Sequence, residues 1–127
     1  MIRLEHANVT VSDPDATAAW LGDVFGWAVR WSGAAMQTGR SVHVGTEAGY
    51  IALFSPGEAK PTTEDSYHTV CSLNHVAVFT DEDIGAVEAR VKAAGFTPGN
   101  HSTYAPGRRF YFHDMDGIEW EVASDQQ

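Results

Sequence analysis

The sequence has little cysteine, few basic residues and no long apolar run. A single cysteine, Cys71, cannot form an internal disulfide, which favours a reducing cytoplasm. No segment approaches the roughly 20 apolar residues that cross a bilayer, and we expect no signal peptide, because a charged start followed by an apolar stretch is missing. Eight Lys and Arg against 17 Asp and Glu give a net charge of −9. That sign repels phosphate backbones and anionic lipids, so we expect neither a nucleic-acid nor a membrane partner.

What the sequence does contain is enough apolar material for a folded core. Its length of 127 residues is typical of one compact domain, and 43% of the residues are apolar. Charged residues make up only 20%, and no long polar tract occurs, so disorder over the whole chain is not expected. We therefore predict a single domain over residues 1–127.

The chain contains an internal repeat. The segment Leu-Glu-His-Ala-Asn-Val at 4–9 is similar to Leu-Asn-His-Val-Ala-Val at 73–78, and their histidines, His6 and His75, are 69 positions apart (75 − 6). The same shift aligns three further pairs along the chain: Gly26 with Gly95, Arg40 with Arg109, and 51–53 with 120–122. Several separated landmarks at one constant offset predict a duplicated structure.

The first half reads as a strand, a helix and three strands. Residues 2–11 alternate between two faces, as a strand does. Asp13 is a plausible N-cap before Pro14, and Gly26 is suited to end a helix that buries Trp20, Leu21 and Val24. Three strands are expected near 27–32, 37–45 and 49–55.

The second half repeats this order. A strand is expected over 71–80, and Thr80 and Asp83 have the spacing of a capping box before a helix. In that helix, Ile84, Val87 and Val91 share one face, and Gly95 should stop it. Strands are expected near 96–101, 107–113 and 117–123. The prediction is thus an α+β fold of two tandem β-α-β-β-β modules that form a cupped mixed sheet, with module one at 1–55, a linker rich in Pro, Gly and charge at 56–70, and module two at 71–127.

Three side chains point away from the apolar, helix-packing faces of their strands. Because alternate residues of a strand share a face, His6 lies opposite Ala7 and Val9, His75 opposite Val76, and Glu121 opposite Trp120 and Val122. If the sheets curl, the two imidazoles and the carboxylate converge. Such a set suits a divalent cation of iron, manganese, zinc, cobalt or nickel and leaves positions open for a substrate.

Plainer interpretations compete with the functional ones. A lone strand histidine is usually a surface or hydrogen-bonded residue, but its recurrence at the same place in two repeats favours a ligand. Glu119 and His113 are candidate general bases, although Glu119 also fits a charge at the rim, which we favour. His43, His68, His101 and His113 are interpreted as structural or solvent-facing, with a place in the lining of a pocket as the alternative for His101 and His113. Arg108 and Arg109 fit either a site for an anionic substrate group or a solvated turn. The residues that could line a substrate pocket are Asn8, Tyr50, Ala52, Phe54, Phe79, Arg109 and Tyr111.

Three segments together resemble the vicinal oxygen chelate superfamily, which includes glyoxalase I, extradiol dioxygenases, methylmalonyl-CoA epimerase, fosfomycin-resistance thiol transferases and bleomycin-binding proteins. They are 2–13, which is similar to the family's opening strand, 73–78, which is similar to the opening strand of its second module, and 114–122. The last segment, Asp-Met-Asp-Gly-Ile-Glu-Trp-Glu-Val, is similar to the closing turn and ligand strand, with Met115 where proline is usual.

The resemblance implies a glyoxalase-like fold with His6, His75 and Glu121 as metal ligands. The first-module carboxylate of glyoxalase I would fall on Ala52, which has no ligand atom, so the four-ligand schemes of glyoxalase I and the epimerase are incomplete here. The three that remain are similar to the triads of the dioxygenases and fosfomycin transferases, although residues 123–127 hold no convincing basic set for a phosphonate. The resemblance also implies a homodimer. Because the linker is long enough for the modules to pair within one chain or to swap between two, the site is expected either within one chain or from His6 of one chain with His75 and Glu121 of the other.

Three functions follow as expectations. The first is a metal-dependent lyase, isomerase or dioxygenase that acts on a small oxygenated molecule. The alternative is a non-catalytic small-molecule binding protein similar to the bleomycin-resistance proteins. The third is a thiol transferase that acts on an antibiotic.

Overall fold

The computed structural model describes residues 1–62, 65–103 and 107–127. The chain forms two compact units, Met1–Lys60 and Pro61–Gln127, and each holds one four-stranded mixed sheet and one helix. This arrangement confirms the α+β class and the two tandem modules. The predicted linker includes residues 63 and 64, which lie outside the described residues, and the predicted module boundaries stay predictions.

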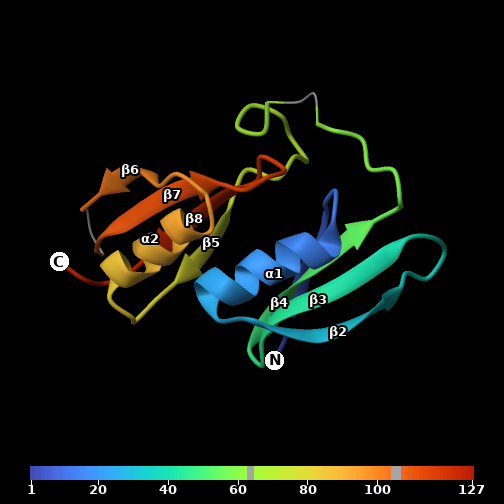
Figure 1. Cartoon of the computed structure of the whole chain (residues 1–127), viewed down its shortest axis with the longest axis horizontal. Helices are drawn as coiled ribbons and strands as arrows, with labels where there is room; N and C mark the ends of the chain where they lie inside the picture. The colour runs from blue at the N-terminus through green and yellow to red at the C-terminus, as the bar shows by residue number, and fades with distance from the viewer. Residues whose placement is uncertain (63–64, 104–106) are drawn as a thin grey trace. The chain divides into compact units, whose positions relative to one another are not determined.

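In the first unit, one helix covers a sheet with the strand order β1-β4-β3-β2. Its elements are β1 (His6–Thr10), α1 (Pro14–Phe25), β2 (Ala28–Ala34), β3 (Arg40–Thr46) and β4 (Gly49–Ser55). The β1–β4 pair is parallel and the other two pairs are antiparallel. Figure 1 shows α1 running along this sheet, and the helix contacts β2, β3 and β4.

Helix α1 begins and ends where its local sequence predicts. The side chain of Asp13 accepts a hydrogen bond from the backbone N–H of Ala16, and Pro14 occupies the first helical position. Gly26 ends the helix at φ 72°, a left-handed conformation that glycine adopts without a steric penalty. As predicted, the helix buries Trp20, Leu21 and Val24. Burial of a side chain the size of leucine or valine contributes roughly 1.5–3 kcal/mol.

The second unit repeats this topology with the strand order β5-β8-β7-β6. Its elements are β5 (Val76–Phe79), α2 (Ile84–Ala93), β6 (Gly99–Ser102), β7 (Arg109–His113) and β8 (Glu119–Ala123). The core is formed by Ile84, Val87 and Val91 of α2, as predicted, together with Phe110, Phe112, Trp120 and Val122 of the sheet. The parallel β5–β8 pair matches β1–β4.

The start of this unit differs from the prediction at two places. Strand β5 begins only at Val76, so His75 lies just before the strand rather than within it. The predicted capping box of Thr80 and Asp83 is wrong, because Asp83 itself caps α2 by accepting from the N–H of Gly85. The hydroxyl of Thr80 instead accepts from the N–H of Glu82 in the preceding turn. A short acidic side chain that reaches an N–H two residues ahead makes the earlier cap unnecessary.

The strand registers test the repeat residue by residue. Asn8 pairs with Ala52 in the first unit, and Ala77 pairs with Glu121 in the second. Both partners are shifted by the predicted 69 positions. Ala52 therefore occupies the position that Glu121 has in the second unit, in agreement with the sequence comparison.

The antiparallel pairs depart from this offset by one residue. Arg40 pairs with Ser55, whereas the strand partner of Ser124 is Arg108, whose carbonyl accepts from the N–H of Ser124. The residue that matches Arg40 is thus Arg108, and the predicted alignment of Arg40 with Arg109 is wrong. A one-residue change of register exchanges the two faces of a strand, so this difference decides where each arginine side chain points.

Among the described residues, no helix is long and apolar enough to cross a membrane.

Candidate functional site

Both repeat histidines are oriented by the residue that precedes them. In the second unit, Nδ1 of His75 lies 2.6 Å from Oδ1 of Asn74, and in the first unit Nδ1 of His6 lies 2.9 Å from Oε1 of Glu5. Both oxygens are acceptors, so each Nδ1 carries the hydrogen, and the lone pair of the neutral ring is on Nε2. A metal-binding histidine is typically held in this way. No motif in the sequence singled out Asn74 and Glu5, although a polar residue stands before each histidine.

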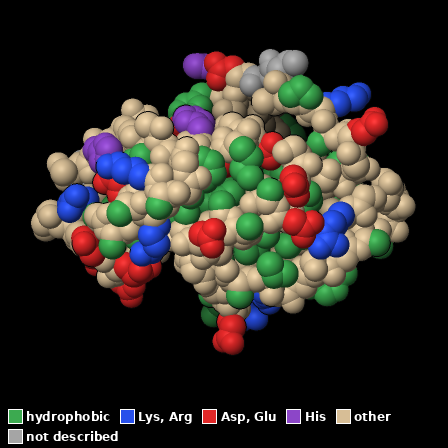
Figure 2. Space-filling model, in the orientation of Figure 1, with side chains coloured by type: hydrophobic (Ala, Val, Ile, Leu, Met, Phe, Trp, Pro, Cys, Tyr) green, Lys and Arg blue, Asp and Glu red, His purple; other side chains and the backbone are tan. Residues whose placement is uncertain are grey.

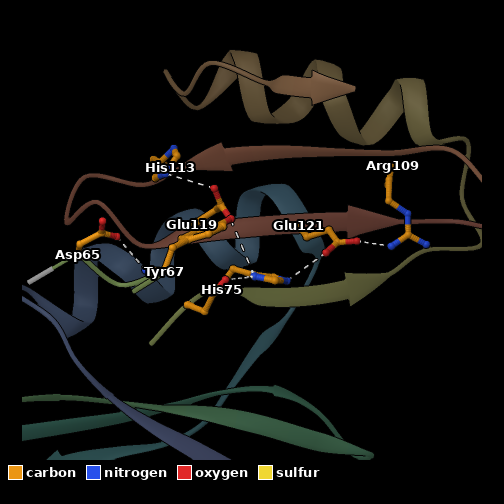
Figure 3. Close-up of polar contacts among 8 residues, drawn as sticks. Asp65, Tyr67, His75, Arg109, His113, Glu119 and Glu121 are labelled. Atoms are coloured by element: carbon orange, nitrogen blue, oxygen red, sulfur yellow. Dashed lines mark hydrogen bonds and ion pairs between the residues drawn. The ribbon is translucent and has the colours of Figure 1, made fainter. Parts of the chain in front are cut away.

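The second unit brings His75 and Glu121 together. Nε2 of His75 lies 3.2 Å from Oε1 of Glu121 (Figure 3). The imidazole is 33% exposed and the carboxylate 6%, so one partner is open to solvent while the other is buried. The parallel pairing of β5 with β8 produces this contact, since it sets Ala77 opposite Glu121 and carries His75 alongside.

Arg109 also belongs to this group of side chains. Its Nη1 donates to Oε2 of Glu121 from the adjacent strand β7 (Figure 3). The guanidinium side chain is only 15% exposed, so the interpretation of Arg109 as part of a solvated turn is wrong. The two oxygens of Glu121 consequently have different partners, Arg109 on one side and His75 on the other.

Glu119 is a buried residue that contacts Tyr67, His113 and, at 4.0 Å from its Oε1, Nδ1 of His75, so the rim charge that we favoured for it is wrong. It is 8% exposed, and its Oε1 accepts from the hydroxyl of Tyr67. Its Oε2 lies 3.5 Å from Nε2 of His113, so the structure brings the two candidate bases together (Figure 3). The hydrogen bond to Glu119, helped by desolvation, raises the pKa of Tyr67. No sequence signal pointed to Tyr67, because it reaches Glu119 across 52 positions of the chain.

The first unit presents a cluster of three rings around His6. The ring of Tyr50 stacks against those of His6 and His43, with centroid distances of 4.9 and 4.8 Å, and the two histidine rings are 6.4 Å apart. The hydroxyl of Tyr50 donates to Glu5, 3.1 Å away, so the same carboxylate receives His6 and Tyr50. These two hydrogen bonds lower the pKa of Glu5, which keeps it an anion beside the imidazole. The guanidinium of Arg30 lies over the ring of Tyr50, 4.5 Å from its centroid.

The candidate pocket residues fall into two groups, one in each unit. Asn8 and Ala52 pair across β1 and β4, and so do Thr10 and Phe54, which places the first group on these two strands. The second group consists of Phe79, Arg109 and Tyr111. Within it, Tyr111 meets the ring of His75 edge-on at 6.0 Å, and Phe79 is 64% exposed. A single pocket made of both groups stays a prediction.

The remaining histidines have structural or solvent-facing surroundings, as interpreted. His68 is exposed beside Asp65, with Nδ1 2.7 Å from Oδ2, and His101 lies 2.5 Å from Glu88 through Nε2. His43 packs in the ring stack of the first unit.

The predicted metal ligands are divided between the units, His6 in the first and His75 with Glu121 in the second. Across residues 1–62, 65–103 and 107–127, no three His, Cys, Asp or Glu side chains form a ready metal cluster. The pair in the second unit nevertheless fits an ion. Two ligand atoms at roughly 2.1 Å from one cation are about 3.0–3.4 Å apart at octahedral or tetrahedral angles, and His75 and Glu121 are 3.2 Å apart. The three-ligand site itself stays a prediction.

Comparison with protein families identifies the family to which the chain belongs. Residues 3–122 match the family described as the Glyoxalase/Bleomycin resistance protein/Dioxygenase superfamily. The chain belongs to this superfamily. The match covers both units of the superfamily member, which agrees with the duplicated topology. No curated protein sequence matches it.

Solved structures share the fold of this superfamily member. A glyoxylase/bleomycin resistance protein/dioxygenase domain from Frankia sp. EAN1pec has a TM-score of 0.80 at 21% identity, covering 98% of this chain and 92% of that one. The fosfomycin resistance protein FosX from Mesorhizobium loti has a TM-score of 0.73 at 24% identity, covering 96% of this chain and 91% of that one. FosX from Listeria monocytogenes has a TM-score of 0.72 at 22% identity, covering 96% of this chain and 90% of that one. At these identities the similarity shows a common fold and leaves the reaction open.

Proposed function

We propose that this superfamily member is a divalent-metal-dependent enzyme, a lyase, isomerase or dioxygenase that acts on a small oxygenated molecule. His6, His75 and Glu121 would hold the metal. The observation that supports the proposal is the contact between Nε2 of His75 and Oε1 of Glu121 in the second unit.

In that contact, two hydrogen-bond acceptors face each other. Asn74 accepts from Nδ1, so an imidazole with one hydrogen faces Glu121 with the lone pair of Nε2, and the carboxylate also offers only lone pairs. Such a pair is stable only with a cation between its members, either a proton or a metal ion. The partial exposure of His75 leaves a path for an ion to enter from solvent.

His6 is the proposed third ligand. Its Nε2 carries the lone pair for the same reason as that of His75, because Glu5 accepts from Nδ1. We propose two alternatives for the origin of this ligand. Either His6 of one chain completes the site of its dimer partner, or one chain supplies all three ligands.

The rest of the group would position the substrate and move protons. A bound divalent cation would polarise a substrate oxygen and stabilise the negative charge that develops on it. Glu119, held by Tyr67 and facing His113, is the proposed proton acceptor. Arg109 would hold Glu121 turned toward His75 through the contact with Oε2.

Metal titration of chelator-treated protein tests this proposal. Calorimetry with Mn²⁺, Co²⁺, Ni²⁺ and Zn²⁺, and anaerobically with Fe²⁺, should give one site per chain. His6→Ala, His75→Ala and Glu121→Gln should each weaken binding at least 100-fold. His68→Ala is the matched control, because His68 is an exposed histidine outside the proposed set. Folded wild-type protein that takes up none of these cations would end the proposal.

A second candidate is a small-molecule binding protein without catalysis. Two observations favour it. Arg109 already neutralises Glu121 without an ion, and the stacked rings of His6, Tyr50 and His43 form a surface suited to a planar ligand. Under this alternative, His75→Ala leaves the affinity for such a ligand unchanged, whereas under the metal-dependent function it abolishes turnover.

A further inference from the structure

A hollow of about 120 Å³ opens in the second unit between α2, β6 and the start of β7. A water molecule needs only about 10–15 Å³ of such space, so the hollow admits a ligand of a few heavy atoms. Polar lining residues include Glu88, His101, Ser102, Thr103 and Arg108. None of these residues belongs to the proposed metal site.

Two arginines line this hollow, and within residues 1–62, 65–103 and 107–127 one of them, Arg108, has no partner for its charge. Arg108 is half-buried, and among the described residues its guanidinium makes no ion pair or hydrogen bond. The other half-buried arginines, Arg90 and Arg109, are paired with Glu82 and Glu121. Acidic residues outnumber basic ones by 17 to 8, so an arginine that is partly withdrawn from water and pairs with no carboxylate is an exception here.

The backbone of Arg108 is held firmly against the C-terminal segment. Its N–H donates to Gln126 O at 2.8 Å, and its carbonyl accepts from both the N–H and the hydroxyl of Ser124 at 3.0 and 2.8 Å. Gly107 packs so closely there that a Cβ atom would lie 2.4 Å from Ser124 O. The guanidinium thus projects from a rigid base, which reduces the entropy that a ligand must remove on binding.

The surroundings of Arg108 are those of a small organic anion. Ser102 and Thr103 bring hydroxyl groups to the hollow, while Phe110 and Ile84, which are 1% and 2% exposed, give it an apolar floor. The one acidic lining residue, Glu88, is in contact with His101 at 2.5 Å. Arg109 also borders the hollow, but it is committed to Glu121.

We infer that this hollow is a second binding site, which takes a carboxylate or a phosphate monoester with its charged end on Arg108. A guanidinium binds both kinds of anion through parallel N–H···O bonds. On the face drawn in Figure 2, blue Lys and Arg atoms are separated from one another by other atoms. Attraction of an anion would therefore come from the local hollow rather than from a broad basic surface.

An NMR titration tests the site with acetate and inorganic phosphate as separate probes, at constant ionic strength set with chloride. Saturable shifts are expected at the amides of 84–88, 101–103 and 107–110. Arg108→Gln should weaken the preferred probe at least tenfold, and Arg108→Lys should weaken it less, because the charge stays while the bidentate geometry is lost. The matched control is Arg3→Gln, which removes an exposed arginine in the other unit.

Each outcome decides the matter. Saturation by acetate alone identifies a carboxylate site, and saturation by phosphate identifies a phosphate site. Non-saturating shifts, an unchanged affinity in folded Arg108→Gln, or an equal loss in Arg3→Gln would overturn the proposal. Amide spectra of each variant without a probe establish that it is folded before affinities are compared.

Discussion

Arg109 and Glu121 lie on neighbouring antiparallel strands, and the guanidinium of the first donates to the buried carboxylate of the second. This contact gives Glu121 one oxygen that is satisfied within the protein and one that faces His75. The pair therefore contributes both to the stability of the second unit and to its proposed chemistry.

Arg109→Gln should destabilise the protein and make it more responsive to metal. The change leaves a nearly buried carboxylate without its cation, which costs about 3–5 kcal/mol by comparison with other buried pairs. Urea denaturation measures the loss. A divalent cation should raise the melting temperature of this variant by more than that of the wild type, because the ion replaces the missing charge.

The control for this change is Arg40→Gln, which removes an exposed pair with Asp15. It should cost much less, since water solvates both of its partners. Equal losses in the two variants would show that the burial of the Arg109 pair has no energetic consequence.

Asn74→Ala should weaken metal binding without removing a ligand. Asn74 holds the Nδ1 hydrogen of His75, and loss of such a supporting contact typically lowers metal affinity about 10–100-fold. Calorimetry on apo-protein measures the effect. Asn100→Ala, an exposed asparagine of the same unit, should leave the affinity unchanged, and a similar fall in both variants would argue against an orienting role.

Asp114→Ala should loosen the turn that leads into β8. The carboxylate accepts from the N–H groups of Asp116 and Ile118 at 2.9 and 3.1 Å, and from Nε1 of Trp120 at 3.1 Å. Leaving these donors without an acceptor should cost about 2–3 kcal/mol. Thermal and urea unfolding measure the loss, and a change below the error of the measurement would contradict the prediction.

The same residue should make stability depend on pH. Burial raises the pKa of Asp114 above its ordinary value of 3.8, although its hydrogen bonds oppose the shift. At pH values between 3.8 and the raised pKa, the folded state consequently binds more protons than the unfolded state. The contribution of Asp114 to the free energy of unfolding therefore falls as pH rises through this range. Asp114→Asn lacks this titration, so the stability of the wild type minus that of the variant should decrease with pH through the same range. A difference that is constant or grows would contradict the sign.

Gly45→Ala should disturb the ring stack of the first unit. A Cβ atom at Gly45 would lie 2.4 Å from Gly49 O and 2.7 Å from the Cα atom of Tyr50, which bears a stacked ring. We expect a loss of roughly 1–3 kcal/mol from this overlap, together with shifted NMR signals of Tyr50 and His6. Gly99→Ala is the matched control in a strand, because nothing lies within 4 Å of its added Cβ atom. An unchanged free energy of unfolding in Gly45→Ala would show that the hairpin accommodates the added methyl group.

The features that the sequence determined by itself are mostly local or repeated. Helix α1 runs from Pro14 to Phe25 because Asp13 supplies an acceptor at one end and Gly26 a left-handed residue at the other. The apolar face of α2 follows from its helical spacing. The predicted repeat offset of 69 relates the parallel registers of the two units, since a duplicated chain repeats its pairing along with its residues.

The tertiary structure decided which side chains meet. The register of β7 against β8 lies one residue from the repeat expectation, and it sets Arg109 beside Glu121 while Arg108 faces the hollow under α2. The contact of Tyr67 with Glu119 spans 52 positions, and no periodicity or cap signals it. Such contacts depend on how distant strands align, and alignment is chosen by the packing of the whole unit. A local pattern therefore predicts where strands and helices lie and leaves the partners of their polar side chains to the fold.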